Sequence, residues 1–529
     1  MIGLILAIGI LFTKNTGTHQ YGDGTTYYLM VESFVKDKNL ILDNKEITRW
    51  KLGEWEEDVN KLFGVYVMVD KKGMLRFAEP ILYPLLMAPF FLFLANTGFV
   101  LLNGLFLGGG IAFGYLFLRQ YFNVISALLI VLMFFFSSFI PIYTAWIHPE
   151  IMLFFACSLC MWLWLAKKKL GFAALIIGIV SSARIVFLLL LVPVIIALVV
   201  KKEFKQLSKA IGMCFLGIVL MLILTFLFTG RFFPSAGGLS YIGTALSPSL
   251  SIDEINATLI NDPVNFFQGV EFQSWGLFFR NLFNFFIGRF SGIIWYAFPG
   301  MVCVIFYLLR RKRLKNEEKI TGDSILLTML LLVVVLIMVK PLNYYGGGGF
   351  ICNRHFFILP ALLFLPALNT FRNFKKVFFV FLLGLIVNFH IFKFEISDED
   401  KIFYNRKYPH TSSPGVFTCV FPLRYLPLEF FQIETFPVDR VKVSDNIYLY
   451  FPLGVRKRIG KRSLVDKGGE IVIVQKNGQK YIKIQTDHRE IILPPKLVLK
   501  SRKGTELRSF YYLKVADPLW VNDVFAVNY

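Results

Sequence analysis

Long apolar stretches separated by short basic segments fill the first three quarters of the chain. They begin at Ile2 to Phe12 and recur at 81–95, 98–118, 123–141, 150–166, 170–200, 211–229, 286–309, 323–340, 355–371 and 377–394. About 20 apolar residues cross the hydrocarbon core of a bilayer as one helix. The pattern therefore predicts an all-α polytopic membrane domain over residues 1–394. The opening run is expected to be a retained first helix, because no small-residue cleavage pattern follows it.

The stretch at 170–200 needs a break. As a single helix it would measure about 46 Å, yet a lysine cluster stands at each of its ends. Two short helices bring both clusters to the same side of the membrane, and Ser181-Ser182-Ala183-Arg184 is where we expect them to separate. If 81–95, which Pro84 and Pro89 interrupt, is a re-entrant or interfacial helix, the chain has about 11 spans.

Basic residues indicate which loops face the cytoplasm. Arginine and lysine gather at 119, 167–169, 201–209, 310–319 and 372–376, where acidic residues are few. The positive-inside rule places these five loops in the cytoplasm. The segments 14–79, 230–285 and 341–354 then lie outside. We expect an inner (plasma) membrane protein whose chemistry is extracytoplasmic.

The periodicity changes near residue 395. From there to residue 529 apolar and polar residues alternate, and Asn477-Gly478 separates two alternating runs in the manner of a hairpin turn. Alternation of this kind predicts a β-rich domain over 395–529. On the topology above, this domain is also extracytoplasmic.

Composition excludes several classes of protein. Residues of the hydrophobic class make up 56% of the chain and charged residues only 17%, whereas soluble proteins carry about 25% charge. The net charge of +21 is explained mainly by membrane topology, so no nucleic-acid partner is expected. The chain has no Walker loop, dinucleotide fingerprint or His-Glu-x-x-His motif. Cys352 and Cys419 both fall outside, which allows a disulfide without requiring one.

The first candidate for chemistry is Asp23, directly outside the first span. Gly22 and Gly24 flank it, and a carboxylate on such an adaptable turn can act as a general base toward a hydroxyl group. The alternative is a helix N-cap, which aspartate before two threonines also fits.

Three further candidate groups fall on the same predicted side. His148 and Glu150 open a helix, either as substrate-binding groups or as a cap placed favourably toward the helix dipole. Arg184 can bind a phosphate with its planar fork, or it can reach the surface by snorkelling. Four glycines at 346–349 precede Arg354 and His355. This last segment could bind a phosphate or protonate a leaving oxygen, or it could form a flexible turn.

In their order and placement these segments resemble the integral-membrane glycosyltransferases of the GT-C superfamily, in particular bacterial relatives of protein O-mannosyltransferases and of the lipid A aminoarabinose transferase. The resemblance is carried by Gly22-Asp23 with Tyr27 and Tyr28, Ser33 through Asp37 to Leu42, Glu79-Pro80 to Pro89, His148-Pro149-Glu150, and Gly347 to Arg354 with Pro360 and Pro366. It does not cover the β-rich region, which could bind the acceptor.

The resemblance implies an inverting hexosyl or pentosyl transfer from a polyprenyl-phosphate donor. The acceptor would be a protein, a glycolipid or an envelope polysaccharide, and the reaction would take place among membrane lipids. Asp23 is the implied catalytic base. The residues implied in donor-phosphate binding are Arg184, Arg354 and His355, and those implied in substrate binding are His148, Glu150, Tyr28, Asp37 and Glu79. Many members have a second acidic residue where this chain has Gly24, so we expect a metal-independent reaction without a cofactor.

Two other classes remain open at this point. In a transporter or flippase for polyprenyl-linked lipids or glycans, the charges would line a path through the membrane. A membrane anchor that presents the β-rich tail would need far fewer spans. Clustering of the charges on one side and the large first outer segment favour the transferase.

Overall fold

The computed structural model describes most of the region between residues 75 and 230 and parts of the rest of the chain. The described residues are 2–16, 23–43, 45–46, 63–69, 75–230, 232, 240–243, 275–287, 292–339, 353–365, 379, 382, and the C-terminal strands given below. The four-glycine segment, both outer cysteines and nearly all of the predicted span at 377–394 lie outside them.

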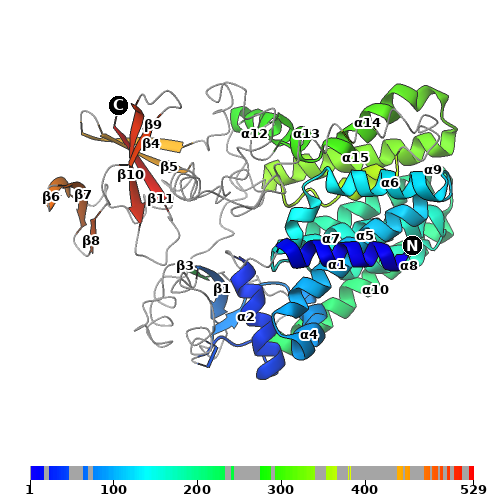
Figure 1. Ribbon diagram of the computed structural model, residues 1–529, viewed down its shortest axis with the longest axis horizontal. Coiled ribbons are helices and arrows are strands. Elements are labelled where there is room, and N and C mark those ends of the chain that lie inside the picture. Colours follow the sequence, from blue (N-terminus) through cyan, green and yellow to red (C-terminus); the bar gives the residue numbers. More distant parts are fainter. Residues whose placement is uncertain are drawn as a thin grey trace.

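Helices form the body of the described structure (Figure 1). They are α1 (Ile2–Thr16), α2 (Asp23–Lys36), α4 (Leu82–Leu94), α5 (Thr97–Leu118), α6 (Val124–Phe136), α7 (Glu150–Met161), α8 (Leu170–Ser181), α9 (Leu191–Val200), α10 (Phe204–Thr229), α12 (Trp275–Ile287), α13 (Ile293–Tyr296), α14 (Phe298–Arg310), α15 (Asn316–Val339) and α16 (Leu359–Leu363). Short 3₁₀ or π segments are η1 (Ile140–Ala145), η2 (Trp162–Ala166), η3 (Ile185–Leu190) and η4 (Arg311–Arg313).

Three of the described helices, α5, α10 and α15, are long and apolar enough to cross a membrane. One side of α10 exposes Phe215, Leu220 and Leu227, which suits contact with lipid. Other apolar helices of 10–17 residues pack beside them. These features support an integral membrane protein.

Glycines bring pairs of these helices into backbone contact. A Cβ built on Gly178 of α8 would overlap the Cys214 carbonyl of α10, and one on Gly9 of α1 would overlap the Gly104 carbonyl of α5. Close approach of this kind is typical of helix pairs within membranes, where small residues stand at the contact.

The break predicted within 170–200 is confirmed. Helix α8 ends at Ser181, and the chain resumes as η3 and α9. The hydroxyls of Ser181 and Ser182 donate to carbonyls three residues earlier, each at 2.7 Å. These side-chain bonds occupy carbonyl groups in the last turn of α8, and such local bonds compete with continuation of a helix.

The prediction of one helix over 286–309 was wrong. Helix α12 ends at Ile287, and two more helices, α13 and α14, follow within the stretch. Pro299 occupies the first turn of α14, a position that favours a new helix start. The stretch at 123–141 likewise ends its α-helix at Phe136 before the η1 segment. The total of about 11 spans remains a prediction.

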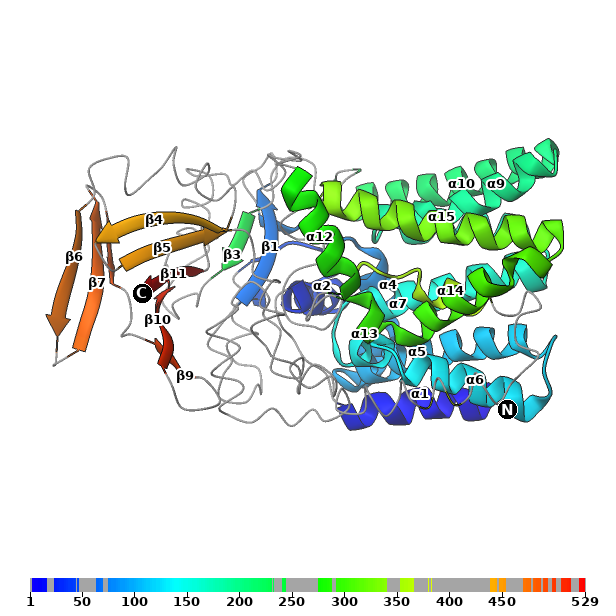
Figure 2. The ribbon, with the colours of Figure 1, turned by 90° about the horizontal axis from the view of Figure 1, so that it is seen from above.

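Two predicted outer segments meet in one small antiparallel sheet. Strand β1 (Phe63–Val69) pairs with β2 (Leu75–Phe77) and with β3 (Ser240–Gly243), which gives the order β2-β1-β3. Figure 2 shows β1 and α2 at one end of the helical bundle, whereas the N-terminus and the turns from α9 to α10 and from α14 to α15 lie at the other end. The basic segments in those two turns are thus remote from α2.

The structure places the alternating C-terminal residues in two further sheets. A five-stranded sheet has the order β4-β5-β11-β10-β9 and a three-stranded sheet the order β6-β7-β8. Their strands are β4 (Val438–Ser444), β5 (Ile447–Pro452), β6 (Glu470–Lys476), β7 (Gln479–Thr486), β8 (Arg489–Ile492), β9 (Leu497–Lys500), β10 (Glu506–Lys514) and β11 (Asp523–Asn528). Lys476 pairs with Gln479, so only Asn477 and Gly478 connect β6 to β7. The role of this region stays a prediction.

Candidate active site

A buried asparagine fixes the segment on which the site is built. The Nδ2 atom of Asn103, in α5, donates to the carbonyls of Thr144 and Trp146 at 2.9 and 3.0 Å. Its Oδ1 accepts from the Tyr83 hydroxyl at 3.0 Å. A fully bonded amide is how an apolar helix tolerates such a residue. The bonds hold the non-helical stretch between η1 and α7 against α5.

His148 and Glu150 form the buried centre of the site. Trp146 adopts an extended backbone at the end of η1, and α7 begins at Glu150. The side chains of His148 and Glu150 are 0% and 1% exposed. Nδ1 of the imidazole contacts Oε2 of the carboxylate, and the indole of Trp146 stacks on the imidazole with centroids 4.0 Å apart. The imidazole is therefore fixed by packing and by an acidic partner.

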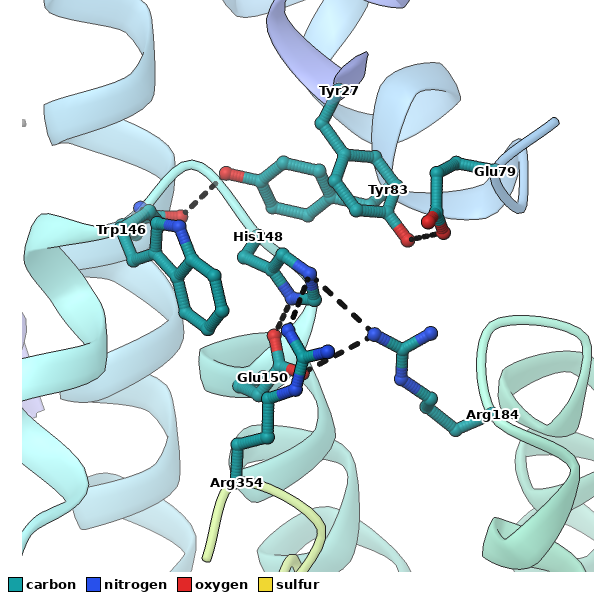
Figure 3. Close-up of polar contacts among 9 residues, drawn as sticks. Tyr27, Glu79, Tyr83, Trp146, His148, Glu150, Arg184 and Arg354 are labelled. Carbon is teal, nitrogen blue, oxygen red and sulfur yellow. Dashed lines mark hydrogen bonds and ion pairs between the residues drawn. The ribbon is translucent and has the colours of Figure 1, made fainter. Parts of the chain in front are cut away.

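Two arginines from distant parts of the chain converge on this pair (Figure 3). Arg184 follows α8 in an extended conformation, and its Nη2 lies 3.4 Å from Glu150 Oε1 and 3.5 Å from His148 Nε2. Arg354 approaches from the segment before α16. Its Nη1 lies 3.3 Å from His148 Nε2, and its Nε lies 4.0 Å from Glu150 Oε1. Arg354 also lies over the Trp146 ring, 5.2 Å from the centroid.

The charges of the cluster are unequal. Among the described side chains with printed contacts here, two guanidinium groups meet one carboxylate, so positive charges outnumber negative ones in largely buried surroundings. The arginine side chains are 18% and 12% exposed, so they are the members of the cluster that a ligand can reach. A buried charge is stable only with a partner of opposite sign, and a phosphate matches the planar donor fork of arginine. The arrangement is suited to binding an anionic group.

A tyrosine connects a second carboxylate to the cluster. The Tyr27 ring of α2 meets His148 edge-on at a centroid distance of 4.9 Å. Its hydroxyl donates to Glu79 Oε2 at 2.8 Å, and Figure 3 shows this pair beside His148. Glu79 is only partly buried. Of the predicted substrate-binding residues, Glu79, His148 and Glu150 are thus brought together.

The start of α2 also reaches this site. Asp23 is the first residue of α2, and a Cβ built on Gly24 would lie 3.0 Å from Trp146 Nε1 and 3.4 Å from the Ile147 carbonyl oxygen. The backbone beside Asp23 is therefore in contact with the segment that carries His148. The direction of the Asp23 side chain is outside what the structure describes.

Other predicted residues lie elsewhere. Tyr28 is buried against Phe91 and Phe99, and burial, with Glu32 nearby, raises the pKa of its phenol so that it stays neutral. Asp37 follows the far end of α2, where its amide donates to the Ser33 carbonyl. Adjacent helix residues point about 100° apart, which explains why Tyr27 and Tyr28 cannot both face the site.

The residues on either side of Arg354, Asn353 and His355, form the turn from which the arginine side chain extends. The backbone amide of His355 donates to Asn353 Oδ1 at 3.0 Å, a turn that the asparagine side chain closes. His355 itself is buried, with 5% exposure. The structure thus places it adjacent to the arginine with which the sequence groups it.

Trp146, Tyr27 and Asn103 are site residues that the sequence analysis did not select. Asn103 had a visible signal, since it is a strongly polar residue within an apolar stretch. Tyr27 stood inside a quoted motif without a role, and Trp146 lies two residues before the His148-Pro149-Glu150 motif. Among the described residues no three His, Cys, Asp or Glu side chains gather as ligands for a metal ion.

Comparison with known proteins gives one structural likeness. No family model and no curated protein matches the chain. Among solved structures it is similar to the crystal structure of ArnT from Cupriavidus metallidurans bound to undecaprenyl phosphate, with 10% sequence identity and a TM-score of 0.42. The match covers 73% of this chain and 63% of that chain. An identity of 10% transfers no chemistry from that protein to this one.

Proposed function

We propose that this protein is an inverting glycosyltransferase of the GT-C type, which moves a sugar from a polyprenyl-phosphate donor to an acceptor on the outer face of the membrane. The observation that carries the proposal is the convergence of Arg184 and Arg354 on buried Glu150 and His148, next to the start of α2. This arrangement supports an anion site beside a candidate base, which is what such a transfer needs.

The arginines would bind the donor phosphate. Their positive charges would attract the phosphodiester linkage of the donor in the ground state. It would stabilise the phosphate monoester more strongly as the bond from the anomeric carbon to oxygen breaks, because negative charge then grows on the phosphate. His355, adjacent to Arg354, belongs to the same proposed group. The sugar-phosphate bond supplies the energy, so no nucleotide is required on the outer side.

Asp23 would accept the proton of the acceptor hydroxyl. As this proton leaves, the hydroxyl oxygen bonds to the anomeric carbon from the face opposite the phosphate, and the polyprenyl phosphate departs with the electron pair of its bond. A single displacement inverts the configuration and needs one base only. The Tyr27–Glu79 pair, beside His148, is suited to hydrogen-bonding sugar or acceptor hydroxyls.

Transfer of label tests the proposal directly. Purified protein in proteoliposomes is given a panel of radiolabelled polyprenyl-phosphate sugars and cell-envelope acceptors, with EDTA present and absent. Native protein should incorporate label, and the transfer rate of Asp23→Asn should be at least about 100-fold lower than that of native protein. The matched control is Asp323→Asn, in the second turn of α15, where the carboxylate pairs with Arg311 of η4; this variant should retain activity.

Two results would contradict this assignment. Full activity in Asp23→Asn would remove Asp23 as the base. Absence of transfer from every donor, with polyprenyl phosphate still bound, would favour the flippase instead.

A further inference from the structure

We infer that His148 is a positioning residue: its Nε2 atom accepts hydrogen bonds from both site arginines and thereby orients their guanidinium groups toward the donor phosphate. The inference rests on the proposed function and assigns to this imidazole a neutral form with a defined tautomer.

The chemistry of the partners defines the tautomer. Arginine has only N–H donors, and two guanidinium groups reach the same imidazole nitrogen, Arg184 at 3.5 Å and Arg354 at 3.3 Å. A nitrogen that receives donors must carry no hydrogen. The hydrogen of the neutral ring is then on Nδ1, which faces the acceptor oxygen Oε2 of Glu150. Each ring nitrogen thus meets the partner that this tautomer requires.

Packing keeps the accepting nitrogen in place. Trp146 stacks on the ring with an interplanar angle of 19°, and Tyr27 meets it edge-on at 79°. The side chain is 0% exposed. Long arginine side chains lose considerable rotamer entropy when a ligand orders them. A fixed acceptor that has already ordered both guanidiniums lowers this cost and tightens binding of the phosphate.

This role differs from acid catalysis by the same residue. With Nε2 carrying no hydrogen and accepting from two arginines, it has no proton to give to a leaving oxygen. Loss of His148 should therefore act mainly on binding of the donor, through the arginines, and less on the chemical step.

Two substitutions separate the functions of the two ring nitrogens. Glutamine places an amide oxygen near the position of Nε2 and can still accept from the arginines. Asparagine places its amide near Nδ1, where it can donate to Glu150, but it leaves the arginines without the acceptor. A third variant, His148→Phe, keeps an aromatic ring against Trp146 and removes both polar functions. Thermal unfolding of each purified variant checks that it is folded.

Binding is measured with undecaprenyl phosphate in nanodiscs, with neutral undecaprenol as the control for the hydrocarbon tail. We expect His148→Gln to bind undecaprenyl phosphate within about 3-fold of native. His148→Asn and His148→Phe should bind about 10- to 100-fold more weakly, the range that loss of a hydrogen bond to a charged group produces. Undecaprenol should bind equally to all four proteins. In transfer assays, KM for the donor should rise in His148→Asn more than kcat falls.

Several outcomes would overturn the inference. Equal losses in the glutamine and asparagine variants would mean that ring packing, and not the acceptor, matters. Native affinity in His148→Asn would mean that His148 does not organise the arginines. A fall in kcat with unchanged affinity would place His148 in the chemical step. Failure of the proposed function looks different, because native protein would then transfer no sugar from any donor, whether or not it binds undecaprenyl phosphate better than undecaprenol.

Discussion

Neutralising Glu150 should destabilise the protein strongly, and an anionic ligand should reverse the effect. The carboxylate is 1% exposed and lies 3.4 Å from Arg184 and 4.0 Å from Arg354. At an effective dielectric constant of about 20, each of these attractions amounts to about 4–5 kcal/mol before desolvation is counted. Removal of one partner from a buried ion pair costs about 3–5 kcal/mol, because the remaining charges stay buried without compensation. Glu150→Gln keeps the shape of the side chain and isolates this electrostatic contribution.

The assay is thermal unfolding of purified protein, with and without undecaprenyl phosphate. Glu317→Gln is the matched control, since Glu317 pairs with Lys201 at 3.1 Å but is 75% exposed, and exposed pairs contribute about 0–1 kcal/mol. We expect Glu150→Gln to unfold several degrees below native and the control to unfold within about 1 °C of it. The phosphate ligand should raise the unfolding temperature of Glu150→Gln more than that of native protein. Equal unfolding temperatures for the two variants would refute the view that Glu150 compensates the buried arginines.

Two other predictions concern stability alone. Gly178→Ala places a methyl group against the Cys214 carbonyl and should lower the free energy of unfolding by about 1–3 kcal/mol. The control is Gly212→Ala, which has nothing within 4 Å of the new Cβ and should be neutral or stabilising. Equal effects of the two substitutions in thermal unfolding would contradict the close contact between α8 and α10. Burial and the hydrogen bond with Asp43 raise the pKa of Glu46 from 4.5 to about 7. The folded chain then holds a proton that the unfolded chain releases, so stability should fall as pH rises from about 4.5 to about 7, and the unfolding temperature of native protein minus that of Glu46→Gln should fall over the same range.

The elements that the sequence predicts best are those with a strong local signal. The break before Arg184 follows from the length of an apolar stretch between two lysine clusters, and the structure has it at that place. The prediction of one helix over 286–309 was wrong, because hydropathy does not register an interruption between apolar helices. Pro299 was the available local signal for the start of α14.

The candidate site illustrates a different limit. Arg184 and Arg354 are 170 positions apart in the chain, and no periodicity indicates that both reach one imidazole. Their grouping on one side of the membrane was predictable from topology, since Arg184 stands at the predicted break within 170–200 and Arg354 directly precedes the predicted span at 355–371. Their convergence on His148 and Glu150 depends on helix packing, which local patterns do not encode. The same holds for Tyr27. That Tyr27 and not Tyr28 faces the site depends on how α2 is rotated against its neighbours.

Gly24 shows how the packing constrains the chemistry of the site. The resemblance to the GT-C superfamily left unexplained why this chain has glycine where many members of that superfamily have a second acidic residue. In the structure any side chain at this position would press on Trp146 and the Ile147 carbonyl. Trp146 in turn stacks on His148 and lies under Arg354, so displacement of the indole would disturb the proposed phosphate site. Glycine therefore allows the start of α2 to pack directly on the segment that carries His148, and a side chain at this position would require Trp146 to shift by a few tenths of an ångström.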